Sequence, residues 1–226
     1  MFRRATKTLT LLSLPVIAHR LYRLSSPAPP PCDLGRRTIA AVGDSNTFGF
    51  GVLLKRRATN SYPAQLERLL NAEYQVLNYG LNSRTLLSTG DRPYIEHRFY
   101  RISRVRQPDV VLIMLGTNDS KWRNWNPDRF RADLRELAVS YRDLGNRPAV
   151  FLLTPPAVYK NAAGIRSDVI REEVIPMIFQ VGTELDLPVI DVHSATTCHP
   201  ELFPDGVHGN AAGYELIAQA VGAHLM

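Results

Sequence analysis

Cysteines and long apolar runs are both scarce in this 226-residue sequence. The two cysteines, Cys32 and Cys198, are too few for a disulfide framework or for a zinc site with four thiolate ligands. The uncharged run near the N-terminus spans only Thr8 to Ala18, which is short of the about 20 residues that a membrane-spanning helix needs. Apolar residues nevertheless make up 45% of the chain, so these absences leave a globular domain with an ordinary hydrophobic core.

The body of the chain also lacks net charge. The formal charge of +6 comes from residues 1–37, which hold seven basic residues and one acidic residue. The 20 basic and 20 acidic residues that follow cancel each other. A nucleic-acid-binding surface would need a basic excess in the folded part, so we expect no nucleic-acid partner.

Residues 1–18 have the order of an export signal. Three basic residues within the first seven positions precede the uncharged run, and Val16 and Ala18 fit positions −3 and −1 of a cleavage site. Cleavage after Ala18 would make the protein periplasmic or secreted. The alternative is an uncleaved amphipathic segment that lies on a membrane or on the body.

Residues 19–36 form the expected Pro-rich linker between this leader and the domain. The linker contains SSPAPPP, Ser25 to Pro31, which predicts an extended polyproline conformation. Cys32 ends the stretch, and it could form a disulfide with Cys198 in an oxidising compartment. A free buried thiol is the alternative. The folded domain is expected to span residues 37–226.

From residue 37 onward, short apolar runs alternate with segments of helical periodicity. The runs are continuously apolar, as is typical of parallel strands that are buried on both faces. The expected strands are Thr38–Val42, Gln75–Tyr79, Val110–Leu115, Ala149–Leu153 and Pro188–Val192.

Helices are expected between these strands. Asn126-Pro127 supplies an N-cap and a first-turn proline for one helix, which Gly145 should end. Ile95 and Phe99 begin the apolar stripe of another helix. Alternating strands and helices with short connections imply a three-layer α/β/α sandwich with a five-stranded parallel sheet. Ligands of such sheets bind at the carboxyl ends of the strands.

Residues suited to acyl transfer follow the expected strands. Ser45 lies just after the first strand, and Asp205 and His208 lie in a loop after the fifth. A serine hydroxyl becomes a good nucleophile when a base removes its proton, and an imidazole exchanges protons near neutral pH. Asp205, three residues before His208, can reach the second imidazole nitrogen and fix its tautomer. We therefore predict Ser45, Asp205 and His208 as a catalytic triad.

Acyl transfer also needs hydrogen-bond donors for the oxyanion of the tetrahedral intermediate. The candidates are the backbone N–H groups of Ser45 and Gly80 and the side-chain NH₂ of Asn118. Glycine at position 80 would let a substrate oxygen approach the backbone closely. Two nearby carboxylates, Asp44 and Asp119, are expected to hold backbone amides at the turns between strands and helices.

This set of motifs resembles the SGNH (GDSL-type) hydrolases. The four blocks of that family correspond to GDSNT at residues 43–47, Gly80, GTND at residues 116–119, and the pair Asp205 and His208. The resemblance covers about residues 38–225 and implies a flavodoxin-like hydrolase fold. Asn46 replaces the leucine of the GDSL form, and Gly209 follows the histidine where a larger residue is common. The G-x-S-x-G motif of α/β-hydrolases is absent.

Longer segments look like bacterial carbohydrate O-acetylesterases, including sialate-type enzymes; SYPAQLERLL at residues 61–70 and HPELFPDGVHGNAAGY at residues 199–214 are examples. The resemblance implies removal of acetyl groups from a carbohydrate or another small polar ester, without a metal or an organic cofactor. Side chains that follow the oxyanion elements would line the substrate cleft, and Trp125 could stack on a sugar face. The candidate substrate-binding residues are Asn82, Arg84, Lys121 and Trp125.

Other interpretations stay open beside this one. The apolar run from Phe48 to Leu54 either packs the first helix or forms a wall for a fatty acyl chain, which would suit a lysophospholipase or thioesterase of the same fold. A non-catalytic carbohydrate-binding relative is a further alternative. The histidines, aspartates and cysteine between Asp191 and His208 invite a metal-site interpretation, but their spacing matches no regular ligand pattern, so we expect no metal.

Overall fold

The computed structural model describes residues 27–33, 35–71 and 73–226. The predicted export signal, residues 1–18, and the first part of the predicted linker lie outside the described residues. None of the helices in the described ranges combines the length and the apolar character that crossing a membrane requires.

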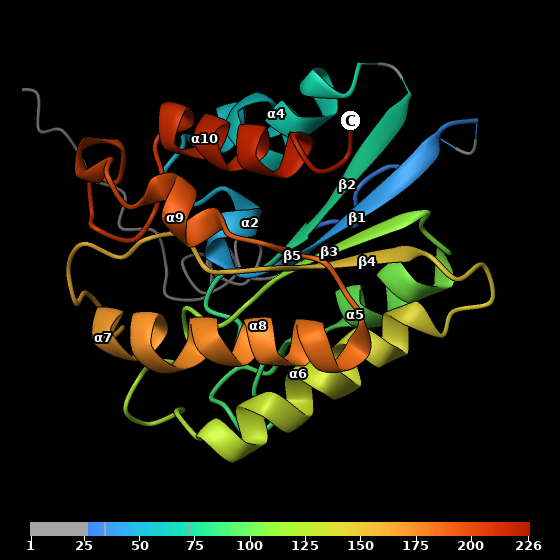
Figure 1. Cartoon of the computed structure of the whole chain (residues 1–226). Helices are drawn as coiled ribbons and strands as arrows, with labels where there is room; N and C mark the ends of the chain where they lie inside the picture. Colours follow the sequence, from blue (N-terminus) through green and yellow to red (C-terminus); the bar gives the residue numbers. More distant parts are fainter. Residues whose placement is uncertain (1–26, 34, 72) are drawn as a thin grey trace, which may run out of the picture.

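Five parallel strands form a single sheet at the centre of the molecule (Figure 1). Their order across the sheet is β2-β1-β3-β4-β5, so the connections cross over between parallel neighbours. This arrangement confirms the predicted five-stranded parallel sheet. The strands are β1 (Arg37–Gly43), β2 (Tyr74–Gly80), β3 (Val110–Met114), β4 (Ala149–Leu153) and β5 (Val189–Ile190).

Helices cover both faces of the sheet, which gives the predicted three layers (Figure 1). Helices α4 and α10 pack against each other on one face, and α6 packs against α8 on the other. The helices are α2 (Ser45–Phe48), α3 (Arg57–Asn60), α4 (Tyr62–Leu69), α5 (Arg98–Val105), α6 (Pro127–Arg142), α7 (Ser167–Val169), α8 (Ile175–Leu185), α9 (Val192–Thr196) and α10 (Ala211–Gly222).

The continuous apolar runs arise because successive strand residues point to opposite cores. In β3, Val111 and Ile113 join the core under α5, α6 and α8, whereas Val110, Leu112 and Met114 join the core under α4 and α10. Every residue of this central strand is buried. An alternating pattern would have left one face of the sheet in water.

Most strand bounds differ from the predictions by one residue, and three further differences have a clear local cause. Helix α6 begins at the predicted cap, where the Asn126 side chain accepts from Arg129 N–H, but it ends at Arg142, before Gly145. Ile95 lies in a separate 3-10 turn, because the extended backbone of His97 caps α5 and starts it only at Arg98. Strand β5 stops after Ile190, since the next residue, Asp191, caps α9.

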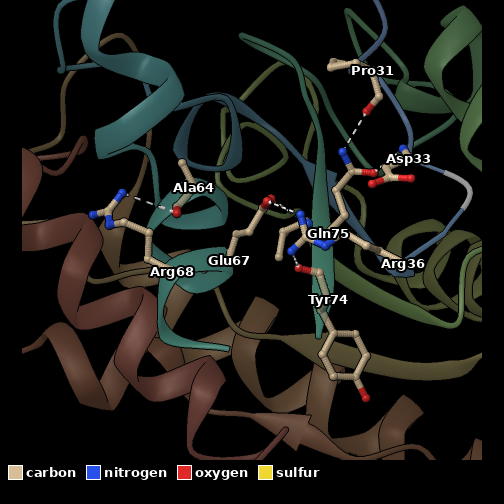
Figure 2. A network of polar contacts seen from close by, with 9 residues as sticks. Pro31, Asp33, Arg36, Ala64, Glu67, Arg68, Tyr74 and Gln75 are labelled. Atoms are coloured by element: carbon tan, nitrogen blue, oxygen red, sulfur yellow. Dashed lines mark hydrogen bonds and ion pairs between the residues drawn. The ribbon is translucent and has the colours of Figure 1, made fainter. Parts of the chain in front are cut away.

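The described part of the Pro-rich segment lies against strand β2, the edge strand of the sheet (Figure 2). Gln75 of β2 accepts from the Asp33 N–H at 2.7 Å and donates to the Pro31 carbonyl at 3.4 Å. Arg98 of α5 donates to the Pro27 carbonyl at 2.8 Å. Backbone groups of this edge strand are paired by other side chains: the Val76 N–H donates to Glu67 at 2.9 Å, and the Tyr74 carbonyl accepts from Arg36 (Figure 2).

Both cysteines are free thiols in this structure. Cys32 packs, partly buried, against the core on the α5 and α6 face. Cys198 is exposed, rather than buried as the free-thiol alternative expected.

We expect His97→Asn to make the protein more resistant to mild acid. The Nδ1 atom of His97 accepts from the Phe99 N–H at 3.2 Å, so the ring caps α5 only while that nitrogen is unprotonated. Burial, helped by Arg84 and Arg98, lowers the pKa of His97 to about 4. An unfolded chain protonates histidine near pH 6.5.

Between about pH 6.5 and 4 the unfolded state therefore binds more protons at His97, and the stability that the neutral ring contributes is lost as the pH falls. Asparagine caps a helix without titrating. Urea unfolding at pH 7 and pH 4.5 should show a smaller loss of unfolding free energy in the variant than in the wild type. Equal losses would contradict this role of His97.

Candidate active site

A serine, a histidine and an aspartate meet at the carboxyl edge of the sheet. Ser45 begins α2, directly after β1, and its Oγ lies 2.9 Å from Nε2 of His208 in the loop before α10. The two residues are 163 positions apart in the chain. On the other side of the ring, Nδ1 of His208 lies 2.6 Å from Oδ2 of Asp205. The three predicted residues are thus within hydrogen-bonding distance in the order that proton transfer from serine requires.

Asp205 is oriented by its own loop. Its Oδ1 accepts from the backbone N–H groups of Val207, at 2.9 Å, and His208, at 2.7 Å. Partial burial acts to raise the pKa of Asp205, but the hydrogen bonds from His208 and Val207 outweigh it and hold the pKa below its usual range. The carboxylate is therefore charged at neutral pH and can support a positively charged imidazole.

The histidine loop is held from the side by the loop that follows α2. The Phe50 ring lies 4.6 Å from the His208 ring, centroid to centroid, and the Tyr214 hydroxyl donates to the Phe50 carbonyl. Gly51, at a φ of 98°, approaches so closely that a Cβ there would lie 2.8 Å from the Gly209 carbonyl oxygen. The backbone of Gly209 therefore packs closely against Gly51, although Gly209 has no side chain of its own.

Two carboxylates near the serine have structural partners, as predicted. Asp44 caps α2 by accepting from Asn46 N–H at 2.9 Å, and burial raises its pKa. Asp119 accepts from the N–H groups of Leu86, at 3.1 Å, and Leu87, at 2.8 Å. Burial raises the pKa of Asp119 to about 7 in spite of these bonds. The two hydrogen bonds of Asp119 connect the loop after β3 to the loop after β2.

Gly80 does not offer the free amide that the sequence led us to expect. Its N–H donates to Oδ1 of Asn78 at 2.9 Å. The glycine is instead required by packing, because a Cβ at this position would lie 2.1 Å from the Phe48 nitrogen and 2.4 Å from the Thr47 carbonyl carbon. The missing side chain allows α2, and with it Ser45, to lie directly against β2.

Asn118 is held rigidly and keeps one amide hydrogen free. Its Nδ2 donates to the Arg84 carbonyl at 3.2 Å, and its own carbonyl accepts from Asn124 Nδ2 at 2.9 Å. The first bond brings residues 82–84 beside Asn118. Within the described residues, neither the N–H of Ser45 nor that of Ser83 has an acceptor.

Ser83 is a residue that the sequence reasoning missed. It adopts a left-handed backbone with a φ of 62°, which is uncommon for residues other than glycine. Its only sequence signal was its place three residues after Gly80. The Arg84 N–H likewise has no acceptor within the described residues, so the free backbone donors on the segment beside Asn118 include those of Ser83 and Arg84, whereas the Gly80 N–H is paired with Asn78.

The apolar run after Ser45 divides between the two roles considered for it. Phe48 is buried and packs the short helix, whereas Phe50, Leu53 and Leu54 are 47%, 61% and 61% exposed. The run and Asn82 together line a cavity of about 340 Å³. Phe50, which lines this cavity, also contacts the His208 ring.

The other candidate substrate-binding residues are less accessible than predicted. Lys121 is buried, and burial lowers its pKa. The Arg84 guanidinium is partly buried, with its Nη1 3.4 Å from the Pro93 carbonyl oxygen, and burial lowers its pKa as well.

Trp125 does not stand at the rim, contrary to the prediction. Its ring packs against Phe130, 5.3 Å away, and its Nε1 donates to Glu173 at 2.9 Å. It is part of the core contacts under α6. The tryptophan that is exposed is Trp122, three residues earlier, which shows 81% of its surface. Both residues are tryptophans, so the residue type alone could not predict which of them is exposed.

The described part of the chain contains no group of three or more histidine, cysteine, aspartate or glutamate side chains placed to hold a metal ion. Asp191 uses its carboxylate to cap α9, accepting from the Ser194 N–H at 3.1 Å. His193 contacts Thr197, and Asp205 pairs with His208.

Comparisons with known proteins agree with this geometry. The model of the GDSL-like lipase/acylhydrolase family matches residues 41–216. An acetylxylan esterase from Xylanibacter ruminicola is 34% identical over 204 residues, which cover 82% of this chain and 42% of that protein. The chain thus spans less than half the length of this curated relative.

Solved structures share the fold over nearly their whole length. A lipase/acylhydrolase from Enterococcus faecalis has 26% identity and a TM-score of 0.67, covering 84% of this chain and 95% of that chain. A catalytic mutant of an acetylxylan esterase from Geobacillus stearothermophilus has 21% identity and a TM-score of 0.65. The match covers 82% of this chain and 92% of that chain.

The short contact between His208 and Asp205 predicts a distinctive proton signal. A hydrogen bond of 2.6 Å to a carboxylate deshields the proton and slows its exchange, so the Nδ1 proton of His208 should appear far downfield in the ¹H NMR spectrum. Asp205→Asn should abolish this signal, whereas the matched variant His199→Gln should keep it. A downfield resonance that survives Asp205→Asn would contradict the pairing.

Proposed function

We propose that this chain, which belongs to the GDSL-like lipase/acylhydrolase family, hydrolyses carboxylic esters through an acyl-enzyme formed on Ser45. One observation carries the proposal: the Ser45 hydroxyl, the His208 ring and the Asp205 carboxylate follow one another at 2.9 Å and 2.6 Å. A capping or turn-forming role for each residue would not require this order.

The first half of the reaction acylates the serine. Nε2 of His208 takes the proton of the Ser45 hydroxyl while Oγ attacks the ester carbonyl carbon. The tetrahedral intermediate then expels the alcohol, to which the imidazolium returns the proton. Asp205 stabilises the imidazolium and keeps Nδ1 protonated throughout. In the second half, a water molecule gives a proton to His208 and attacks the acyl carbonyl carbon. The tetrahedral intermediate then releases the carboxylic acid, while the imidazolium returns the proton to the Ser45 oxygen.

The negative oxygen of each intermediate needs fixed donors. We assign them to the N–H of Ser45, the free Nδ2 hydrogen of Asn118 and the N–H of Ser83. Loss of one such donor typically raises the barrier by about 2.7–4 kcal/mol. The support is that these donors lack other acceptors within the described ranges, whereas the Gly80 amide has one.

The substrate we favour is a small polar ester, with an acetyl group on a carbohydrate as the first choice. The support comes from the curated relative, named an acetylxylan esterase, and from the predicted resemblance to carbohydrate O-acetylesterases. Asn82, which lines the cavity beside His208, is the substrate contact that the geometry favours among the four predicted ones.

A second candidate is a lysophospholipase or thioesterase activity. The exposed side chains of Phe50, Leu53 and Leu54 favour it, because they offer an apolar surface next to His208 to which a fatty chain could bind.

We also propose roles for the N-terminal residues and limits for the hydrolase domain. We infer that residues 1–18 direct export to the periplasm or the medium, or hold the protein at a membrane. Residues 37–226 would then form the hydrolase domain, and the Pro-rich segment would connect the two while resting on β2.

Ser45→Ala is expected to lower turnover of p-nitrophenyl acetate by about 10⁴-fold or more, because it removes the nucleophile. Unfolding free energy should change by no more than about 1 kcal/mol, since one hydrogen bond is lost. Ser140→Ala, in α6 and away from the site, is the matched control and should retain activity. A wild-type protein that binds glycans but turns over no ester would instead favour the non-catalytic alternative.

The length of the acyl chain separates the two enzymatic candidates. We expect kcat/KM on p-nitrophenyl esters to be highest for acetate and to fall steeply beyond about four carbons, because a site built for acetyl overfills. A maximum at eight or more carbons, together with hydrolysis of lysophospholipid or acyl-thioesters, would contradict the acetylesterase proposal and support the second candidate.

A further inference from the structure

The side chain of Trp122 is largely exposed and does not pack into the hydrophobic core. It shows 81% of its surface, whereas Trp125, three residues later, is packed and hydrogen-bonded. A large aromatic side chain left in water often marks a binding surface. Neither the proposed chemistry nor the core uses this ring.

The Trp122 ring is held in place by a built support. The guanidinium of Arg166 lies over one face of the ring, 3.9 Å from its centroid. Arg166 is itself fixed by Ser120, which is fully buried: its Nε donates to the Ser120 carbonyl at 2.6 Å, and its N–H donates to the Ser120 hydroxyl at 3.0 Å. The other face of the ring is therefore presented in a fixed orientation, which reduces the entropy lost on binding.

The support lies on the same edge of the sheet as the proposed site. Trp122 is four residues from Asn118, and such a span reaches at most about 14 Å even when fully extended. The backbone turns tightly here, since the N–H groups of Asn124 and Trp125 both bond to the Lys121 carbonyl.

A second connection reaches Trp122 from the histidine loop. The segment between β4 and α7 contacts that loop at one end, where Tyr159 N–H donates to the Gly206 carbonyl at 2.8 Å. At its other end the same segment supplies Arg166. Trp122 is therefore connected through the chain to Asn118 in the loop after β3, and through Arg166 to the loop that carries His208.

We propose that Trp122 and Arg166 form a platform that binds a sugar ring of the glycan whose ester is cleaved at Ser45. This inference rests on the proposed function and names the part of the substrate that lies away from the reacting bond. A pyranose ring carries C–H groups on its faces, which pack against the electron-rich face of an indole. Its hydroxyl groups lie at the ring edge, and Arg166 supports the indole from the opposite face without contacting the sugar.

The surroundings of Trp122 suit a sugar better than a fatty chain. Arg123, largely exposed and paired with Asp91, and Arg166 are its neighbours, so the surface next to the ring is polar. The apolar surface of the molecule near the site lies elsewhere, at Phe50, Leu53 and Leu54. An acyl chain at Trp122 would desolvate charged groups without gaining apolar contacts in return.

The test compares two substrates that share the acetyl group. We expect Trp122→Ala to lower the ratio of kcat/KM for acetylated xylohexaose to that for p-nitrophenyl acetate by about tenfold, mainly through KM. Trp122→Phe should recover most of the ratio, because it restores an aromatic face. Phe179→Ala is the matched control: this exposed aromatic lies beside residues at the start of β5, at the other edge of the sheet, and should leave the ratio unchanged.

The outcomes separate this inference from the proposed function. If the wild type hydrolyses both substrates and Trp122→Ala leaves the ratio within twofold, the platform is overturned and the esterase stands. Hydrolysis of p-nitrophenyl acetate alone also overturns the platform.

If neither substrate is hydrolysed, the proposed function fails, and calorimetric titration of Ser45→Ala with xylohexaose decides the platform by itself. Binding that weakens about tenfold or more on adding Trp122→Ala supports the platform, and unchanged or absent binding refutes it.

Discussion

The hydrogen bond between the Ser45 hydroxyl and the His208 ring joins two loops that are 163 residues apart, and the site has no chemistry without it. A parallel sheet makes the contact possible, because all of its strands end at one edge, where loops from distant parts of the chain meet. The packing of α10 on α4 brings the histidine loop back over the start of α2. Asp205 then needs no separate support, since its own loop supplies two backbone donors and orients the carboxylate toward the ring.

Several backbone groups around this contact are paired within the protein, whereas Asn46 Nδ2, Thr47 Oγ1 and Arg84 Nε are buried without a partner among the described residues. Asn78 takes the Gly80 amide, Asp119 takes two amides of the loop after β2, and Asn124 holds the Asn118 carbonyl. Buried polar groups in proteins are usually hydrogen-bonded, and these backbone groups have their partners within the protein. Because the Gly80 amide is already bonded to Asn78, we propose in its place, as an oxyanion contact, the N–H of Ser83, which has no acceptor within the described residues.

Two different surfaces lie near the proposed nucleophile. The loop after α2 exposes apolar side chains beside His208, whereas the loop after β3 exposes a tryptophan supported by an arginine. The proposed contacts for the acyl group and for the sugar therefore lie on two different loops of the chain.

The amino-acid sequence alone indicated the family, the five strands, the start of α6 and the residues of the predicted triad. These features depend on local periodicity, on capping residues and on motifs read in chain order, and the family match over residues 41–216 confirms the family. The free backbone amides, the choice between Trp122 and Trp125 and the steric role of Gly80 were decided only by tertiary structure. The packing of α2 on β2 and the bond from Trp125 to Glu173 join residues that are distant in sequence. The bond from the Gly80 amide to Asn78 spans only two residues, but it forms because the fold orients the Asn78 side chain toward that amide. Residue type limits what a side chain can do, but its neighbours in space determine whether it stays free to do it.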